Sequence, residues 1–387
     1  MNPNVKIPRA VWVLGFVSLL SDLSSEIIHS LLPLYLTVGL GASALAVGVI
    51  EGAAEAVSLV VKIFSGTLSD RLRHRKWIAA AGYGLGAASK PLFALAQGPW
   101  LVFAARFIDR IGKGIRGAPR DALVADLTPR EVQGAAYGLR QSLDTIGALA
   151  GPLVAMALML AWHDDFRAVF WVAVIPGALS FALVALGVRE PERRADAVKV
   201  PSPWTGFREL PRAFWLVTLA GGALTLARFS EAFLILRAQD LGVPLAYAPL
   251  VLAGMSLAYM VTAYPAGVLA DRMPRPFLLA FGTGFLIAAD VVLAFAAGPM
   301  ALALGVALWG LHMGLTQGLL AAMVAASVPA HLRGTGFGAF NLASGVAMLV
   351  ASATAGALWH YVGPAATFWA GAALATVAVV LTRFWRS

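Results

Sequence analysis

Residues 105–126 read ARFIDRIGKGIRGAPRDALVAD, and this stretch decides the fold. It holds five cations and three acids, whereas the sequence on either side is among the most apolar in the chain. The stretch is therefore either a solvated loop or a membrane helix with buried charges. Its charged residues are Arg106, Asp109, Arg110, Lys113, Arg116, Arg120, Asp121 and Asp126.

The composition indicates a membrane protein. Of 387 residues, 59% are hydrophobic and only 13% are charged, whereas soluble domains carry about 25% charged residues. This is too little polar material to cover a soluble globule of such a size. The chain has no cysteine, which excludes disulfides, cysteine metal sites and thiol nucleophiles.

Twelve segments are apolar and long enough to be membrane spans, each of which needs about 20 residues. The first begins after a short N-terminus with two cations and no cleavage site, so we expect an uncleaved helix. The predicted spans are 10–38, 44–69, 77–96, 99–125, 134–160, 166–188, 212–240, 246–270, 276–296, 299–326, 335–359 and 364–384.

The distribution of cations predicts the topology. Connections after even-numbered spans are basic, whereas those after odd-numbered spans nearly lack cations, with Arg167 as the main exception. By the positive-inside rule, both termini and the linker at 189–212 are cytoplasmic, and we expect a bacterial inner-membrane protein. The formal net charge of +9 then reflects topology, so no nucleic-acid partner is expected.

The two halves of the chain repeat each other. Gly66, Asp70 and Arg71 recur at a shift of 201 residues as Gly267, Asp271 and Arg272, and Pro129, Gly134 and Gly138 recur at a shift of 200 as Pro329, Gly334 and Gly338. Such six-span repeats are a known transporter architecture. We therefore predict an N-terminal six-helix half (1–188), a cytoplasmic linker (189–211) and a C-terminal six-helix half (212–387).

Three motifs resemble those of the major facilitator superfamily. GTLSDRLRHRK (66–76) matches every defined position of the superfamily signature between spans two and three, and GVLADRMPRP (267–276) is its weaker copy. RFIDRIGKG (106–114) resembles the fourth-span signature but departs from it at Asp109 and Arg110. GALAGP (147–152) resembles the fifth-span signature associated with antiporters.

The resemblance covers the whole chain. It implies an all-α membrane protein in which twelve transmembrane helices form two pseudo-symmetric halves, with transport by alternating access as the halves rock. The motif residues that it assigns to gating are Gly66, Asp70, Arg71, Arg75, Lys76, Asp271, Arg272, Gly147, Gly151 and Pro152.

The opening stretch then belongs to span four, which has to run from about residue 99 to 125 to reach the cytoplasm. At about 100° per residue, six of its charged side chains fall within an arc of about 120°. They are Arg106, Asp109, Arg110, Lys113, Arg116 and Arg120. Phe107, Ile108 and Ile111 lie on the opposite side. Charges facing lipid would each cost several kcal/mol, so we expect the charged face to contact protein or a watery cavity.

Acids on neighbouring spans can compensate these cations. Such pairs are either structural or serve proton transfer and substrate binding, because a buried ion pair adds little net stability. The candidates for proton coupling are Asp22, Glu26, Glu51, Glu55, Asp109 and Glu231. The candidates for substrate binding are Arg106, Arg110, Lys113, Arg116, Arg140, Arg228, Trp309, His312 and Gln317.

Other chemistry is not supported. The histidines of the spans lack ligand spacing, so no metal site is predicted, and no cofactor is expected. GKGIRG lacks the ending of a phosphate-binding loop, and no hydrolase motif occurs, so we expect no enzyme.

The sequence predicts a monomeric secondary transporter that moves a small ionic or amphipathic solute, coupled to protons. The antiporter signature favours efflux by antiport. The cations of span four also fit the alternative of uptake by symport of an organic anion or a metal chelate. A membrane sensor or assembly factor is the third alternative, and it is disfavoured because the sequence shows no added signalling domain.

Overall fold

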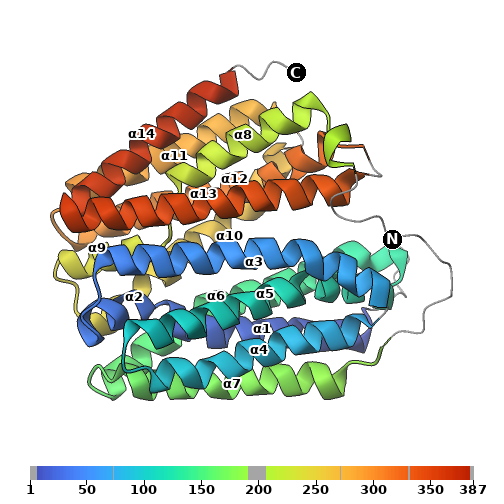
Figure 1. Ribbon diagram of the computed structural model, residues 1–387, viewed down its shortest axis with the longest axis horizontal. Coiled ribbons are helices and arrows are strands. Elements are labelled where there is room, and N and C mark those ends of the chain that lie inside the picture. Colours follow the sequence, from blue (N-terminus) through green and yellow to red (C-terminus); the bar gives the residue numbers. More distant parts are fainter. Residues whose placement is uncertain (1–6, 73, 191–205, 271, 330–331, 384–387) are drawn as a thin grey trace. The chain divides into compact units, whose positions relative to one another are not determined.

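The computed structural model describes residues 7–72, 74–190, 206–270, 272–329 and 332–383. All regular secondary structure in these ranges is helical, and the predicted all-α fold with twelve spans is confirmed (Figure 1). Predicted and observed ends of the spans agree to within a few residues.

The first six spans comprise seven α-helices and one π-helical segment. The first span is interrupted after His29, where a short helix and the π-helical segment complete it. The elements are α1 (Arg9–His29), α2 (Leu32–Leu34), the π-helix Tyr35–Gly39, α3 (Ala44–Leu72), α4 (Arg75–Leu95), α5 (Pro99–Leu127), α6 (Gln133–Ala161) and α7 (Phe166–Gly187).

The last six spans repeat this pattern. The seventh span is also interrupted, between Ala227 and Ala232, and α9 begins 200 residues after α2 (232 − 32). The elements are α8 (Arg212–Ala227), α9 (Ala232–Asp240), α10 (Leu250–Ala270), α11 (Arg275–Phe295), α12 (Pro299–Ala326), α13 (Arg333–Tyr361) and α14 (Pro364–Arg383).

The helices form two compact units. Unit 1 contains the described parts of Met1–His29 and Val57–Pro203, and unit 2 contains those of Ser30–Ala56 and Trp204–Ser387. The N-terminal part of α3 therefore packs with the second half of the chain. The division at 188 and 212 that the repeat predicts stays a prediction, and most of its linker lies outside the described residues.

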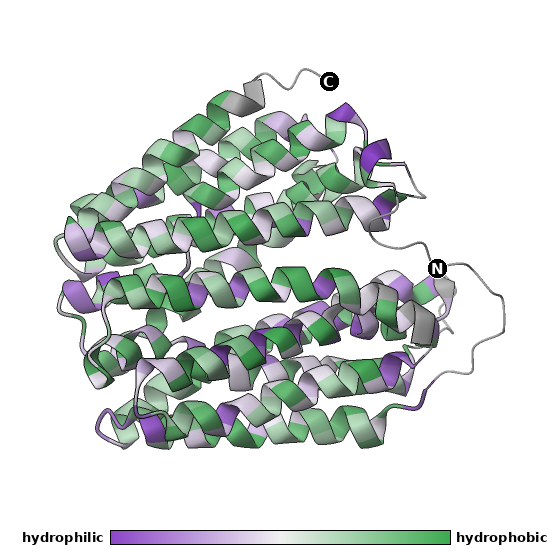
Figure 2. Cartoon of the chain, in the orientation of Figure 1, coloured by the Kyte–Doolittle hydropathy of each residue, from purple (hydrophilic) through white to green (hydrophobic). Residues whose placement is uncertain are grey.

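Hydrophobic residues dominate most of the long helices (Figure 2). Among the described residues, nine helical segments are long and apolar enough to cross a membrane by length and composition. α5 is not one of them, because its charges lower its mean hydropathy. The span assignment of α5 therefore depends on where those charges point.

Glycines bring the helices of unit 1 close together. A Cβ atom on Gly147 of α6 would lie 2.5 Å from the carbonyl oxygen of Leu19 on α1. A Cβ atom on Gly112 of α5 would lie 2.6 Å from the carbonyl oxygen of Gly82 on α4. These contacts leave no room for a side chain, so α1 is held against α6 and α4 against α5.

Unit 2 contains a similar close contact. A Cβ atom on Gly48 of α3 would lie 2.2 Å from the carbonyl oxygen of Ser352 on α13. Ser352 also accepts a hydrogen bond at its Oγ from the backbone N–H of Ser230, within the interruption of the seventh span. The first part of α3 is thus tied to α13 and, through Ser352, to the broken span.

Candidate functional site

The charged face of α5 points into protein, as the helical arc predicts. The side chains of Arg106, Asp109, Arg110 and Arg116 are all buried. Lys113 lies on the same face and is exposed. The close contact of α5 with α4 positions this face against the polar residues of α4 and α1, which form the candidate site.

A deeply buried ion pair of the site joins α4 to α5. Lys90 Nζ lies 2.7 Å from Asp109 Oδ1, and the two side chains are 3% and 4% exposed. Lys90 also donates a hydrogen bond of 3.0 Å to Ser25 Oγ on α1, and Arg106 Nη1 lies 4.0 Å from Asp109 Oδ2. Asp109 is therefore held by two cations within the spans.

A second pair joins α1 to α5. Arg116 Nη2 lies 3.7 Å from Asp22 Oδ1, and its guanidinium carbon lies 4.8 Å from the centroid of the Tyr83 ring on α4. A guanidinium over an aromatic face is attracted by the ring quadrupole. Arg116 thus contacts both an acid and an aromatic ring, which fixes its position between the three helices.

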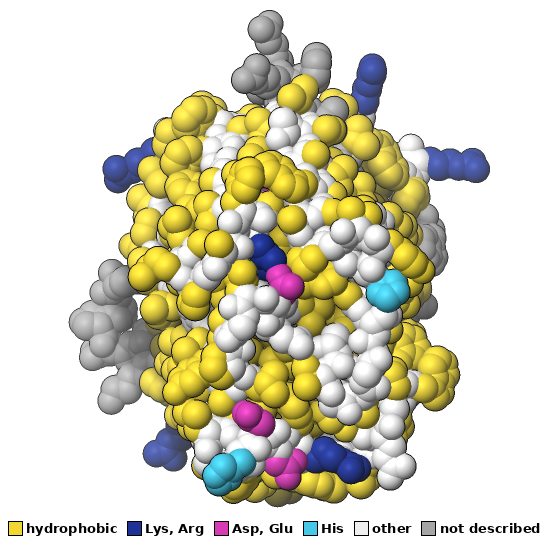
Figure 3. Space-filling model, turned by 90° about the vertical axis from the view of Figure 1, so that its left-hand side faces the viewer, with side chains coloured by type: hydrophobic (Ala, Val, Ile, Leu, Met, Phe, Trp, Pro, Cys, Tyr) yellow, Lys and Arg dark blue, Asp and Glu magenta, His cyan; other side chains and the backbone are white. Residues whose placement is uncertain are grey.

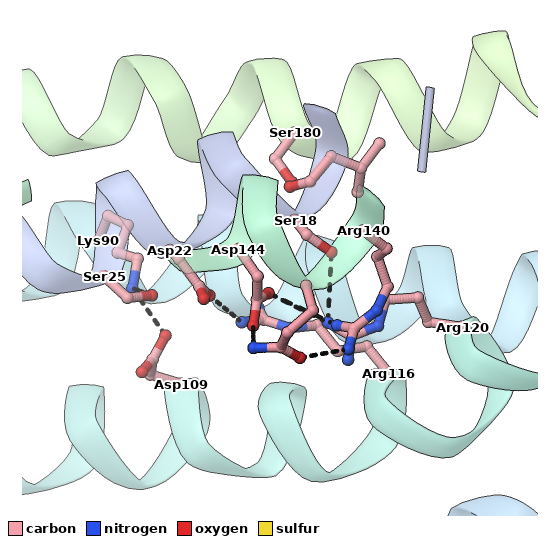
Figure 4. Close-up of polar contacts among 12 residues, drawn as sticks. Ser18, Asp22, Ser25, Lys90, Asp109, Arg116, Arg120, Arg140, Asp144 and Ser180 are labelled. Atoms are coloured by element: carbon pink, nitrogen blue, oxygen red, sulfur yellow. Dashed lines mark hydrogen bonds and ion pairs between the residues drawn. The ribbon is translucent and has the colours of Figure 1, made fainter. Parts of the chain in front are cut away.

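A third group of charges joins α5 to α6 (Figure 4). Asp144 Oδ1 lies 3.7 Å from Nη1 of Arg120 and 3.7 Å from Nη1 of Arg140. Asp121 Oδ1 lies 3.1 Å from Arg120 Nε and 3.8 Å from Arg140 Nε. Arg120 also donates a hydrogen bond to Ser18 Oγ on α1. The two acids and two arginines form one connected network.

The remaining acidic candidates of the first two spans lie in different surroundings. Glu26 Oε2 lies 3.4 Å from His29 Nδ1, one turn along α1. Glu51 is buried and Glu55 is half-buried, both on the part of α3 that belongs to unit 2. The structure therefore places Asp22 and Glu26 beside the charged face of α5 in unit 1, and Glu51 and Glu55 in the other unit.

The candidates of the second half lie around the broken seventh span and α12. Arg228 and Glu231 are half-buried in the interruption between α8 and α9. Trp309 and His312 are fully buried on α12, where His312 Nδ1 lies 2.9 Å from the carbonyl oxygen of Gly282. Gln317 is half-buried on the same helix.

The motif between spans two and three is anchored to α5. Arg75 Nη1 donates a hydrogen bond of 2.6 Å to Asp126 Oδ2, and the backbone N–H of Lys76 donates one to Glu190. Gly66 is half-buried, and an added Cβ there would meet only ordinary contacts. Arg272 of the second copy is exposed. Asp271 and the side chains of Asp70 and Arg71 lie outside the described residues.

The fifth-span motif is a packing device in the structure. Gly147 and Gly151 both face α1, and a Cβ atom on Gly151 would lie 2.6 Å from Glu26 Cβ. Pro152 is buried within α6. The motif therefore holds α6 against the part of α1 that carries Asp22 and Glu26.

Sequence analysis did not select Lys90 for the site. Its partner Asp109 lies on another helix, so no spacing within one helix indicates the pair. In the structure, close Gly82–Gly112 packing fixes the register of α4 against α5 and brings residue 90 beside residue 109. No group of three or more potential metal ligands occurs among the residues that the structure describes.

Chemically, the site can exchange protons and bind an ionic group. A carboxylate beside a cation can be neutralised by a proton, after which the cation is free to bind another anion. Asp22, Asp109 and Asp144 all have such an arrangement. The exposed Lys113 supplies a cation on the same face.

The family model described as Major Facilitator Superfamily matches residues 14–236 and 217–387. The chain belongs to the Major Facilitator Superfamily. An MFS-type transporter of Methanocaldococcus jannaschii is 30% identical to this facilitator over 98% of the chain and 95% of the relative. The Multidrug resistance protein MdtH of Yersinia pestis is 32% identical over 45% of the chain and 41% of the relative.

Solved structures of other transporters share the fold of this facilitator. The nucleoside transporter NupG gives a TM-score of 0.81 at 14% identity and covers 97% of this chain and 100% of that one. A POT family transporter bound to 5-aminolevulinic acid gives 0.80 at 15% identity and covers 97% and 95%. The family model and the MFS-type relative identify the chain as a multi-pass membrane transporter. Hydrophobic side chains predominate on the face that Figure 3 shows, with scattered charges.

Proposed function

We propose that the facilitator exports a small ionic or amphipathic solute across the bacterial inner membrane by proton antiport. The observation that carries this proposal is the set of buried and half-buried ion pairs around the charged face of α5. Three acids within the spans, Asp22, Asp109 and Asp144, each lie within 4.0 Å of a cation. Buried pairs are a poor source of net stability, so their number favours a role in the transport cycle.

In the proposed antiport mechanism, a proton and a cationic group of the solute compete for the carboxylates of the charged site. When a proton neutralises Asp109, the attraction that holds Lys90 and Arg106 beside it is lost. The neutral carboxyl group also no longer attracts a cationic group of the solute, which is released, and the site can bind such a group again when the proton leaves. The exposed Lys113 and the buried Arg110 would contact the ionic part of the solute, and Glu26, beside His29, would relay the proton.

Two observations support export. The GALAGP motif at 147–152 resembles the antiporter signature, and it lies against the part of α1 that carries Asp22 and Glu26. The partial match to a multidrug resistance protein points in the same direction. Loss of the ion pairs of unit 1 would then change proton coupling, whereas loss of Lys113 would change substrate affinity.

A second candidate function is proton-coupled uptake of an organic anion or a metal chelate. The cations of the α5 face favour it, because Lys113 is exposed while the acids beside it are already paired. Export and uptake differ in the pH gradient that drives accumulation. In antiport, protons move against the direction of the solute, whereas in symport they move with it.

The deciding experiment has two stages. A thermal-shift screen of purified protein at two pH values first identifies solutes that stabilise it. Each hit is then tested in proteoliposomes with an imposed pH gradient of either sign. Antiport predicts accumulation only when the lumen is acidic, because protons leave as the solute enters. Accumulation only with an acidic exterior would support symport, and gradient-independent equilibration would refute proton coupling.

A further inference from the structure

Asp290 is a buried carboxyl group in the second half. It lies on α11, its residue is 0% exposed, and neither of its carboxyl oxygens has a hydrogen-bond partner among the described residues. A buried carboxylate without a partner is costly, and such a group avoids the cost by holding a proton. Asp290 thus differs from Asp22, Asp109 and Asp144, which all lie beside cations.

The internal repeat places Asp290 at the position that an ion-paired residue occupies in the first half. α4 (Arg75–Leu95) and α11 (Arg275–Phe295) correspond at a shift of 200, as do the starts of α5 and α12. Lys90 therefore corresponds to Asp290, and Asp109 corresponds to Trp309. In the first half these two positions form the ion pair of 2.7 Å. In the second half they hold an acid and an indole, and the indole Nε1 also has no hydrogen-bond partner among the described residues.

The surroundings of Asp290 are closely packed and apolar. A Cβ atom on Gly371 of α14 would lie 2.6 Å from Asp290 Oδ2 and 3.0 Å from Cε1 of Phe229. The Phe229 ring in turn contacts Trp309, with 5.3 Å between centroids, and Phe368, with 5.7 Å. The bare backbone of Gly371 and the Phe229 ring thus close over the carboxyl group.

Charged groups lie nearby on the neighbouring elements, and they have other partners. Arg237 of α9 donates hydrogen bonds to the carbonyl oxygens of Leu293 and Ala296, at the end of α11. Arg228 precedes Phe229 and interacts electrostatically with Glu231 and Glu55. His312 of α12 contacts Gly282. Neither α10 nor residues 364–380 of α14 contain Asp, Glu, Lys, Arg or His.

We propose that Asp290 is a proton-binding site of the second half, which exchanges its proton with water when the contact between α11 and α14 at Gly371 loosens. The O–H bond of the carboxyl group breaks, the proton passes to water, and the carboxylate remains until the contact closes and it is protonated again. A role of Asp290 in coupling rests on the proposed proton-coupled function. As a proton-binding site, it can be tested independently of that function.

Infrared difference spectroscopy of the reconstituted protein at neutral pH tests the binding of the proton. A protonated carboxyl group absorbs at a carbonyl frequency where carboxylates and amides do not. We expect this band in the wild-type protein, its loss in Asp290→Asn, and its shift after transfer to D₂O. A wild-type spectrum that matches that of Asp290→Asn would overturn the proposal, as would a band that never shifts in D₂O.

Two glycine variants make the test independent of Asp290→Asn. Gly371→Ala pushes a methyl group against Oδ2, so we expect the band to shift. Gly284→Ala on α11 is the matched control, because an added Cβ there meets nothing within 4 Å. An unchanged band in Gly371→Ala, with the fold intact, would contradict the placement of the proton beside Gly371.

The coupling role is measured separately. If the wild-type protein shows proton-driven transport, Asp290→Asn should lose accumulation against the gradient and keep substrate exchange. Full proton-driven accumulation by Asp290→Asn would overturn the coupling role. Absence of proton-driven transport in the wild-type protein would instead refute the proposed function, while the infrared band would still decide whether Asp290 binds a proton.

Discussion

Lys90 and Asp109 form a buried ion pair between α4 and α5, with 2.7 Å between Nζ and Oδ1 and side chains that are 3% and 4% exposed. Removal of Asp109 takes away the carboxylate that pairs with Lys90, and removal of Lys90 leaves Asp109 with the longer contact to Arg106. We expect Lys90→Met and Asp109→Asn each to destabilise the protein by about 3–5 kcal/mol. The double variant should recover most of this stability.

A transport assay distinguishes an ion pair that only stabilises the fold from one that takes part in proton coupling. Purely structural pairing predicts that the double variant regains both stability and transport, whereas a coupling role predicts recovered stability without proton-driven transport. Thermal unfolding measures the stability of each variant, and proteoliposome assays measure its proton-driven transport. Asp121→Asn is the control, because its carboxylate is 42% exposed and such pairs contribute about 1 kcal/mol or less.

Substitution of Lys113 tests whether this residue binds the substrate. It is exposed on the charged face of α5, so its loss should weaken binding of an anionic group without unfolding the protein. We expect Lys113→Gln to reduce the affinity for a solute found in the thermal-shift screen by about tenfold, or about 1.4 kcal/mol, and Lys113→Arg to retain it. Equal affinities of Lys113→Gln and the wild-type protein would exclude a direct contact.

Gly147 tests the packing of α1 against α6. The Cβ atom of Gly147→Ala would lie 2.5 Å from the backbone oxygen of Leu19, so the helices must separate, at a cost of about 1–3 kcal/mol. Gly138→Ala on the same helix is the matched control, since it meets nothing within 4 Å. We expect that variant to be neutral or slightly stabilised. Similar melting temperatures for the two variants would contradict the close contact.

Glu26 tests proton coupling on α1. Its carboxylate lies 3.4 Å from His29 Nδ1. We expect Glu26→Gln to abolish gradient-driven transport and to leave substrate exchange intact, because the amide cannot carry a proton. Loss of both activities in equal measure would indicate a structural or substrate-binding role instead.

Cysteine labelling tests the topology, since the native chain has no cysteine. We expect Asp196→Cys, in the basic linker, to be protected from an impermeant reagent applied to intact cells. Gly98→Cys, in an odd connection, should be labelled, and an added side chain there has open space. Labelling of position 196 from outside would reverse the predicted topology.

The spans and the orientation of the α5 charges could be predicted from sequence, because apolar length and helical periodicity are local properties. α5 begins at Pro99 and ends at Leu127, close to the predicted 99–125, and Arg106 and Asp109 are buried as expected. The i, i+4 spacing of Arg140 and Asp144 is also a local property of the sequence, and the structure contains this pair.

Contacts between helices could not be predicted in the same way. The partner of Lys90 depends on the register of α4 against α5, which glycine contacts set. The interruption at Arg228 and Glu231 also escaped prediction, because a span of uninterrupted apolar character was expected over 212–240. Arg228 and Glu231 lie where the backbone leaves the helix, so ideal helix geometry does not describe how they are placed.

The packing of the first part of α3 has a consequence for biosynthesis. Gly48 contacts Ser352, a residue that the ribosome adds 304 positions later (352 − 48). During synthesis, the glycine-lined surface of α3 therefore enters the bilayer long before α13 exists to cover it. We expect lipid or an insertion chaperone to occupy this surface in the meantime, and a chain cut after its sixth span to remain incompletely assembled.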